Sequence, residues 1–184
     1  MIKALQQAAR LHKTRIMKLK MAGLAITIII TLLASCGRQL NQSSFEIMLE
    51  GLLNHSVPER SVAQVKEERQ CIFLDARERN EFDVSHIKNA VWVGYKKFSV
   101  KQLKGIDKNE KIIVYCSIGY RSEKVAEKLI EAGYTNVSNL YGGIFGWVND
   151  GNLVYKNSNK PTSEVHAYNH LWGKWLRVGK KVYD

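Results

Sequence analysis

The chain has 184 residues, of which 45% are hydrophobic and 24% are charged, and its formal net charge is +11. This length leaves room for one ordinary domain with extensions, and the composition is that of a globular protein. The positive charge suggests nucleic acid as a partner, but six of the 28 Lys and Arg residues lie in the first 35 residues, which hold no Asp or Glu. Because much of the excess charge is local, we expect no nucleic-acid partner.

The first 35 residues have the order of a secretory signal peptide. The basic segment leads into an apolar run, MAGLAITIIITLLA at 21–34, which is shorter than the roughly 20 residues of a comfortable membrane span. Small residues follow this run, as is typical of such signals. An uncleaved anchor helix is the alternative. Starting the chain at Met17 instead of Met1 would give a signal of ordinary proportions.

The end of this segment, Leu33-Ala34-Ser35-Cys36, resembles the lipobox of bacterial lipoproteins. In that family the cysteine becomes the acylated first residue of the mature chain. The resemblance therefore implies a lipid on Cys36, attachment to the bacterial membrane and a location facing the periplasm or the cell exterior. Gly37 in place of an aspartate favours the outer membrane, by resemblance to enterobacterial lipoproteins. The polar residues that follow make 36–44 a flexible tether.

Beyond the tether, apolar runs alternate with segments of helical spacing. A short amphipathic helix is expected within 45–55, and a brief extended piece with a second short helix within 57–69. Four apolar runs predict strands: 71–76, 90–94, 111–116 and 136–140. Helical segments follow these runs: 77–87, 99–106, 121–133 and 144–151. This alternation predicts an α/β fold with a mostly parallel sheet and helices on both faces.

Cys116 lies where the strand at 111–116 ends and the helix at 121–133 begins, in the loop CSIGYRS. Ligands of parallel sheets bind beyond the carboxyl ends of the strands. Gly119 allows the loop to turn several backbone N–H groups inward. The helix N-terminus and the charge of Arg121 favour the thiolate form of Cys116 and attract an anionic substrate. The alternative is a small core cysteine beside a surface arginine.

Cys71 opens the strand-like run CIFLD. Because free cysteine is among the most buried residue types, we expect a thiol in the core. A disulfide is possible in an oxidising compartment, but a pair of remaining cysteines does not establish one.

Three segments resemble the rhodanese domain of sulfurtransferases: CSIGYRS, FLDARERNEFDVSHIKNAVWV at 73–93, and NVSNLYGGIFGW at 136–147. The resemblance implies a single rhodanese-like domain over 45–155, with a core at about 57–151 and five parallel strands between helices. It further implies that Cys116 takes a sulfane sulfur from a small anionic donor of the thiosulfate type, carries it as a persulfide and passes it to a thiophilic acceptor. Neither a cofactor nor a metal is implied.

The same resemblance assigns roles to the residues around Cys116. It implies a substrate cradle formed by Ser117, Ile118, Gly119, Tyr120 and Arg121. It also implies structural roles beside the cradle for Asp75, Arg77, Glu78 and His86. Gly142 and Gly143 are expected to permit a tight turn and close packing.

Two alternative functions stay open. A related phosphatase family of the cell-cycle type has one more residue between its cysteine and arginine, whereas four residues separate Cys116 from Arg121. The shorter loop favours sulfur over phosphate. A sulfur-relay or scaffold lipoprotein without catalytic turnover is the second alternative.

The segment 156–184 lies beyond the family core as a C-terminal extension. His166 and His170 are spaced four apart, which would suit a metal on a helix, but no third ligand is evident. We instead expect Trp172 and Trp175 to pack on the domain.

The lipobox leads to the first testable prediction. Cys36→Ser should leave the protein unlipidated and alter its processing, because this thiol is the expected acylation site. Metabolic labelling with a fatty-acid analogue measures the difference from wild type. Equal labelling of the two proteins would remove the lipoprotein assignment.

Overall fold

The computed structural model describes residues 20–21, 23–24, 30, 44–68 and 70–184. It divides into two units, Met1–Phe45 and Glu46–Asp184, and the second contains the fold. The lipobox and Cys36 lie outside the described residues, as does most of the expected signal peptide. In the described part of the chain, no helix is long and apolar enough to cross a membrane.

A five-stranded sheet with the order β1-β5-β4-β2-β3 forms the centre of the second unit, and its neighbouring strands pair in parallel. The strands are β1 Glu59–Arg60, β2 Ile72–Asp75, β3 Val91–Trp92, β4 Ile112–Tyr115 and β5 Val137–Leu140. The predicted α/β fold with five parallel strands is confirmed. Because β4 ends at Tyr115, Cys116 is the first residue beyond the carboxyl end of the central strand.

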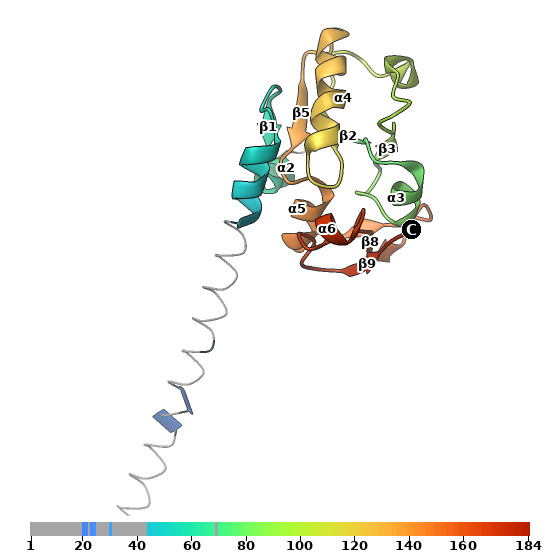
Figure 1. Cartoon of the computed structure of the whole chain (residues 1–184). Helices are drawn as coiled ribbons and strands as arrows, with labels where there is room; N and C mark the ends of the chain where they lie inside the picture. The colour runs from blue at the N-terminus through green and yellow to red at the C-terminus, as the bar shows by residue number, and fades with distance from the viewer. Residues whose placement is uncertain (1–19, 22, 25–29, 31–43, 69) are drawn as a thin grey trace, which may run out of the picture. The chain divides into compact units, whose positions relative to one another are not determined.

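The helices follow the strands in the predicted order. They comprise a helical segment at 44–52, α2 Val62–Glu67, α3 Arg79–Val84, the 3-10 turn η1 Val100–Leu103, α4 Tyr120–Glu131 and α5 Gly143–Asn149. All four residues of β4 and all four of β5 are buried. Burial on both faces explains the continuous apolar sequence of β4, whereas β5 also buries the polar residues Ser138 and Asn139. Figure 1 shows α4 running alongside β5.

The long helix α4 buries Val125, Ala126 and Leu129 in the main core. Ile130, which shares their helical spacing in the sequence, is instead 41% exposed. Gly133 follows the helix with φ of +87°, a conformation that favours glycine and ends the helix as the sequence predicted.

The C-terminal extension is ordered into short elements. These are β7 Pro161–Thr162, β8 Glu164–His166, α6 His170–Gly173 and β9 Lys180–Val182. β7 pairs with β6 Val154–Tyr155, which lies just before the extension. β8 and β9 pair in parallel. In Figure 1, α6, β8 and β9 gather at the end of the domain that carries α3 and α5, and Asn80 Nδ2 of α3 donates to Asp184 Oδ1 at 2.6 Å.

The two histidines of the extension do not share a helix. His166 belongs to β8 and its Nε2 lies 3.1 Å from Asp184 Oδ1, whereas His170 opens α6 and stacks on Tyr183. Their spacing in the sequence therefore does not place them as a metal pair on one helical face. Over the residues whose positions are described, no group of three or more His, Cys, Asp or Glu could hold a metal ion.

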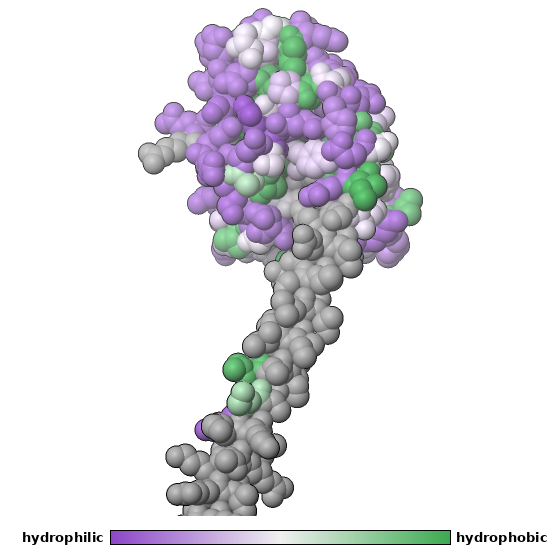
Figure 2. All heavy atoms as spheres, turned by 90° about the vertical axis from the view of Figure 1, so that its left-hand side faces the viewer, coloured by the Kyte–Doolittle hydropathy of each residue, from purple (hydrophilic) through white to green (hydrophobic). Residues whose placement is uncertain are grey.

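Polar side chains cover most of the surface of the second unit that is visible in one view. Figure 2 shows one face of the second unit, on which most described residues are hydrophilic and the hydrophobic ones form separate small groups.

Candidate active site

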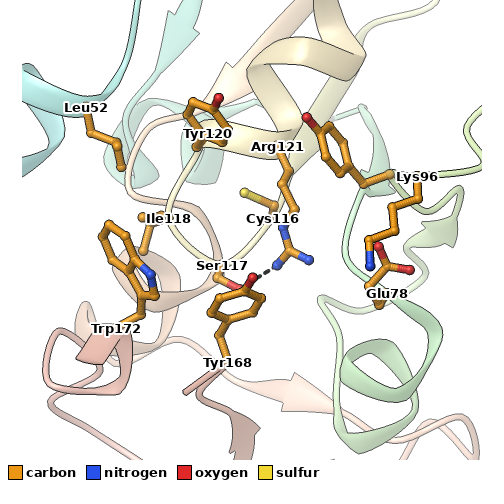
Figure 3. Close-up of a pocket in the computed structure, with 11 residues that line it drawn as sticks. Leu52, Glu78, Lys96, Cys116, Ser117, Ile118, Tyr120, Arg121, Tyr168 and Trp172 are labelled. Atoms are coloured by element: carbon orange, nitrogen blue, oxygen red, sulfur yellow. Dashed lines mark hydrogen bonds between the residues drawn. The ribbon is translucent and has the colours of Figure 1, made fainter. Parts of the chain in front are cut away.

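Cys116 opens into a pocket of about 360 Å³. Four parts of the second unit supply its walls: the end of the helical segment 44–52, the loops around α3 and after β3, the segment that begins α4, and the C-terminal extension. The lining residues are Leu52, Glu78, Tyr95, Lys96, Cys116, Ser117, Ile118, Tyr120, Arg121, Tyr168 and Trp172. Figure 3 shows the Cys116 side chain at the centre of this set.

The loop after β4 curls around the sulfur. Gly119 has φ of +117°, and its backbone N–H donates to Cys116 Sγ at 3.2 Å. An L side chain rarely adopts this conformation, so glycine is what lets the amide turn back onto the thiol. Immediately afterwards Tyr120 begins α4, and the positive end of that helix favours negative charge at the sulfur.

The carbonyl groups of the same loop are held from beneath by α5. Ile144 N donates to Cys116 O at 2.9 Å, and Phe145 N donates to Ser117 O at 3.0 Å. A Cβ atom on Gly143 would lie 2.5 Å from Cys116 O and 2.7 Å from Ile118 N. The backbone of α5 therefore approaches the loop as closely as only glycine permits.

This contact leaves loop amides available for a ligand. The backbone N–H groups of Ser117, Ile118, Tyr120 and Arg121 have no hydrogen-bond acceptor in the described part of the chain. Successive backbone N–H groups of this kind form an anion-binding nest. The arrangement can stabilise negative charge that develops on or next to the Cys116 sulfur.

Arg121 is held in a polar network with Glu81 and Ser117. Its Nη1 donates to Glu81 Oε2 at 2.6 Å, and its Nη2 donates to Glu81 Oε1 at 2.8 Å and to Ser117 Oγ at 2.9 Å. Ser117 Oγ in turn donates to Glu81 Oε1 at 3.2 Å. The two-pronged pair clamps α3 to the start of α4 across the base of the loop.

Electrostatics favour the charged forms of this pair. Burial opposes ionisation of Glu81, but the hydrogen bonds and charge of Arg121 outweigh it and hold the pKa of Glu81 below its usual range. Burial likewise disfavours the charge on Arg121, yet Glu81 keeps the pKa of Arg121 above its ordinary value. The positive charge of Arg121 is therefore largely engaged by a carboxylate, and its guanidinium also lies 5.2 Å from the ring centroid of Tyr168.

Asp75 and Arg77 form a second buried pair, outside the pocket lining. Arg77 Nη2 donates to Asp75 Oδ2 and to Ser85 O, each at 2.6 Å, and both side chains are inaccessible to solvent. The Arg77 carbonyl accepts from Trp92 Nε1 at 2.9 Å. These bonds tie β2 to the end of α3 and to β3, which is a structural arrangement.

His86 and Glu78 occupy different positions beside the loop. The His86 ring stacks on Phe82 with 3.9 Å between the ring centroids, and its backbone exchanges two hydrogen bonds with Tyr155. Glu78 caps the start of α3 and also lines the pocket. Of the four residues expected beside the cradle, Glu78 alone belongs to the pocket wall.

A buried pair on the other side of the loop was not recognised in the sequence. Asn139 of β5 donates from Nδ2 to Gly119 O at 3.1 Å, and Ser122 Oγ lies 2.7 Å from Asn139 Oδ1 and 3.0 Å from Gly119 O. These contacts hold the Gly119 carbonyl away from the sulfur.

Other pocket residues also escaped the sequence analysis. Glu81 carries a local signal, since it lies three residues after Glu78 in a capping box, but its pairing with Arg121 is not local. Trp172 was expected to pack on the domain, and the structure places it in the wall of the pocket. Nothing in the spacing of Tyr168 or Lys96 pointed to this site.

Cys71 differs in detail from the expected core thiol. It lies just before β2, not in it, and is only partly buried. Partial burial and then the charge of Glu68 raise the pKa of its thiol. In the parallel register of β2 and β4, Cys71 lies opposite Lys111, five residues before Cys116. The two cysteines are therefore at opposite ends of these strands, about 16 Å apart along the strand direction. That separation is too long for a disulfide, and both thiols are free.

Comparison with known proteins agrees with this architecture. The family model described as a rhodanese-like domain matches residues 60–150. Among solved structures, the rhodanese-like domain of an Anabaena protein matches with a TM-score of 0.50 and 23% identity, covering 54% of this chain and 79% of that domain. A thiosulfate sulfurtransferase from Pseudomonas aeruginosa matches with a TM-score of 0.50 and 21% identity, covering 65% of this chain and 23% of that protein. These identities support the fold alone.

Curated relatives include proteins named tRNA uridine(34) hydroxylase. The protein from Buchnera aphidicola subsp. Acyrthosiphon pisum is 30% identical over 137 residues, covering 64% of this chain and 42% of that protein. The one from Bacillus cereus is 33% identical over 92 residues, covering 47% of this chain and 29% of that protein. The chain thus spans less than half the length of these relatives. The matched family model, the parallel sheet and the cysteine loop agree, and residues 60–150 of this chain form a rhodanese-like domain.

Proposed function

We propose that the protein is a sulfurtransferase in which Cys116 carries sulfane sulfur as a persulfide. The observation that supports this most directly is the environment of Sγ, which accepts the Gly119 N–H while neighbouring loop amides have no acceptor in the described structure. A persulfide extends from the thiol by one sulfur and bears negative charge, and inward-facing amides stabilise that charge.

In the first half-reaction the Cys116 thiolate attacks the outer sulfur of a donor. The bond between that sulfur and the remainder of the donor breaks, and the remainder leaves with the electron pair. A new S–S bond joins the transferred sulfur to Cys116. The helix start and the loop amides direct dipoles at the sulfur that stabilise negative charge during the attack.

In the second half-reaction a thiophilic acceptor, such as a thiolate or cyanide, attacks the outer sulfur of the persulfide. The S–S bond breaks, the acceptor keeps the transferred sulfur and Cys116 returns to the thiolate. The two steps form a ping-pong cycle that the residues of this loop support without a metal or cofactor.

Arg121 was expected to bind the substrate through its charge, and we propose that positioning is its main role. The support is that Glu81 and Ser117 already engage the guanidinium of Arg121. Through this clamp Arg121 fixes the loop around Cys116, and only part of its positive charge reaches a bound anion.

The curated relatives act as tRNA uridine hydroxylases according to their names. Most of their length lies outside the match. Sulfur chemistry at the thiol is therefore the activity that this chain's own site supports.

We also propose that the protein is a lipoprotein attached to the bacterial membrane through Cys36. The support is the lipobox-like sequence after a basic and then apolar segment. The sulfur donor and acceptor would then be met outside the cytoplasm.

Treatment of the purified protein with thiosulfate tests the sulfur-carrier role. Wild type and Cys71→Ser should each gain a single sulfur atom, seen by intact-mass spectrometry, and lose it to cyanide with release of thiocyanate. Cys116→Ser should do neither. Loss of turnover in Cys71→Ser would indicate a redox pair in place of a single carrier. A wild type that binds sulfur donors without persulfide formation would support a scaffold, and faster cleavage of an aryl phosphate would support a phosphatase.

A pair of glycine substitutions in α5 tests the support of the loop. Gly143→Ala should lower persulfide formation by about 100-fold, since its Cβ would meet the backbone of the loop at 2.5 Å and φ is +56°. Gly146→Ala is the matched control, because the nearest atom to its Cβ lies at an ordinary 3.5 Å. Stopped-flow kinetics and circular dichroism separate loss of rate from loss of fold. Equal rates for the two variants would contradict this support.

Substitution of Arg121 distinguishes a clamp from a simple charge. Arg121→Lys keeps the charge but cannot make the two-pronged contact with Glu81, so we expect the rate of persulfide formation to fall about tenfold. Lys124→Ala on the same helix is the control, since Lys124 pairs with Glu127 at the surface. Full activity of Arg121→Lys in steady-state assays would show that the charge alone suffices.

A further inference from the structure

The C-terminal extension builds a wall of the pocket above Cys116. Tyr168 and Trp172 both come from this extension and line the pocket together with the catalytic loop. Their side chains point towards Cys116 and Ser117 in Figure 3. The extension is therefore part of the binding site.

Hydrogen bonds within the extension hold the backbone of Tyr168 and Trp172 in place before any ligand binds. Asn169 Oδ1 accepts the Trp172 N–H at 3.0 Å at the start of α6. The Tyr168 N–H donates to His166 Nδ1 at 3.1 Å, and His166 Nε2 lies 3.1 Å from Asp184 Oδ1. His166 is itself buried, so the base of this wall is ordered. A preformed wall reduces the entropy lost on binding.

The pocket has an apolar half and a charged half with the thiol between them. Leu52, Ile118 and Trp172 lie on one side of Cys116 in Figure 3, and Glu78 and Lys96 lie on the other. The volume of about 360 Å³ is in the range of pockets that hold organic ligands. Inorganic thiosulfate has only a few atoms and would leave the apolar half empty.

The charges also favour a substrate with little negative charge. Arg121 is engaged by Glu81, and Glu78 contributes a second carboxylate to the wall that holds Lys96. Among the residues that line the pocket, Lys96 is the one side-chain cation outside the Arg121–Glu81 pair, so a doubly charged anion next to the Cys116 thiolate would meet a single lysine and the loop amides. A singly charged donor with an apolar group suits this balance better.

Resting on the proposed sulfurtransferase function, we propose that the substrate is an organic sulfane-sulfur compound whose apolar or aromatic group occupies the half-pocket formed by Leu52, Ile118 and Trp172. For a thiosulfonate, R–SO₂–S⁻, the Cys116 thiolate attacks the outer sulfur, the S–S bond breaks and R–SO₂⁻ leaves with the electron pair. For an organic persulfide, R–S–S⁻, the leaving group is R–S⁻. In both reactions one S–S bond is exchanged for another and the charge is conserved.

Two donors with the same reactive group test the proposal on the full mature chain. Wild type should show a kcat/KM for benzenethiosulfonate about tenfold above that for methanethiosulfonate, because the ring buries apolar surface that the methyl group does not. Trp172→Ala should reduce this ratio towards one. Leu171→Ala is the matched control on the same short helix, since Leu171 is 63% exposed and does not line the pocket, and it should keep the ratio.

A second variant guards against a general effect on the extension. Leu52→Ala changes the same half-pocket from a distant part of the chain and should also lower the ratio. Equal kcat/KM for the two donors in wild type, or an unchanged ratio in folded Trp172→Ala, would overturn the inference.

Binding to Cys116→Ser, measured by calorimetry, separates this inference from the proposed function. Preferential binding of benzenethiosulfonate without sulfur transfer by wild type would refute sulfur transfer and retain the aromatic pocket. Persulfide formation without any preference for the aromatic donor would retain sulfur transfer and refute the pocket assignment.

Discussion

The site depends on the contact between α5 and the loop after β4. Two backbone N–H groups at the start of α5 have no acceptor within their own helix and instead donate to the carbonyls of Cys116 and Ser117. Once these carbonyls point downwards, the loop amides can face the sulfur. Gly143 makes the contact possible, because any side chain there would overlap the loop backbone. The N–H groups at the start of α5, which lack acceptors in their own helix, thus set the conformation of the proposed anion-binding loop.

The second constraint joins segments that are far apart in the chain. Glu81 of α3 pairs with Arg121 of α4, and Arg121 also contacts the Tyr168 ring of the extension. Burial makes such a pair costly if one member is lost, because the other would remain as an uncompensated charge. The pair is therefore better understood as a device that fixes geometry than as a large source of stability. It places α3, the loop and the extension in one arrangement around the thiol.

In our proposal, the extension adds substrate recognition to the rhodanese-like domain. The loop and the start of α4 provide a cradle sized for a sulfur atom and its charge. Tyr168 and Trp172 add a wall that extends the cradle into an apolar space. We thus infer that the proposed reaction chemistry and substrate preference come from different parts of the sequence. The backbone of the Cys116 loop supports the reaction. Side chains from outside residues 60–150, the part that matches the family model, contribute to the substrate preference.

The sequence alone determined the strands, the helix after Cys116 and the loop between them, because apolar periodicity, glycine and the start of a helix are local signals. It also predicted the order of the α/β elements and the place of Cys116 between a strand and a helix. Tertiary packing decided three features that local signals do not predict. Glu81 pairs with Arg121 across 40 residues, and Ile130 is exposed to solvent although its spacing suggested the core. The C-terminal extension also contributes residues to the pocket. These outcomes depend on which surfaces meet once the sheet has formed. The spacing of residues along the chain does not predict which surfaces meet, because these contacts join segments that are distant in the sequence.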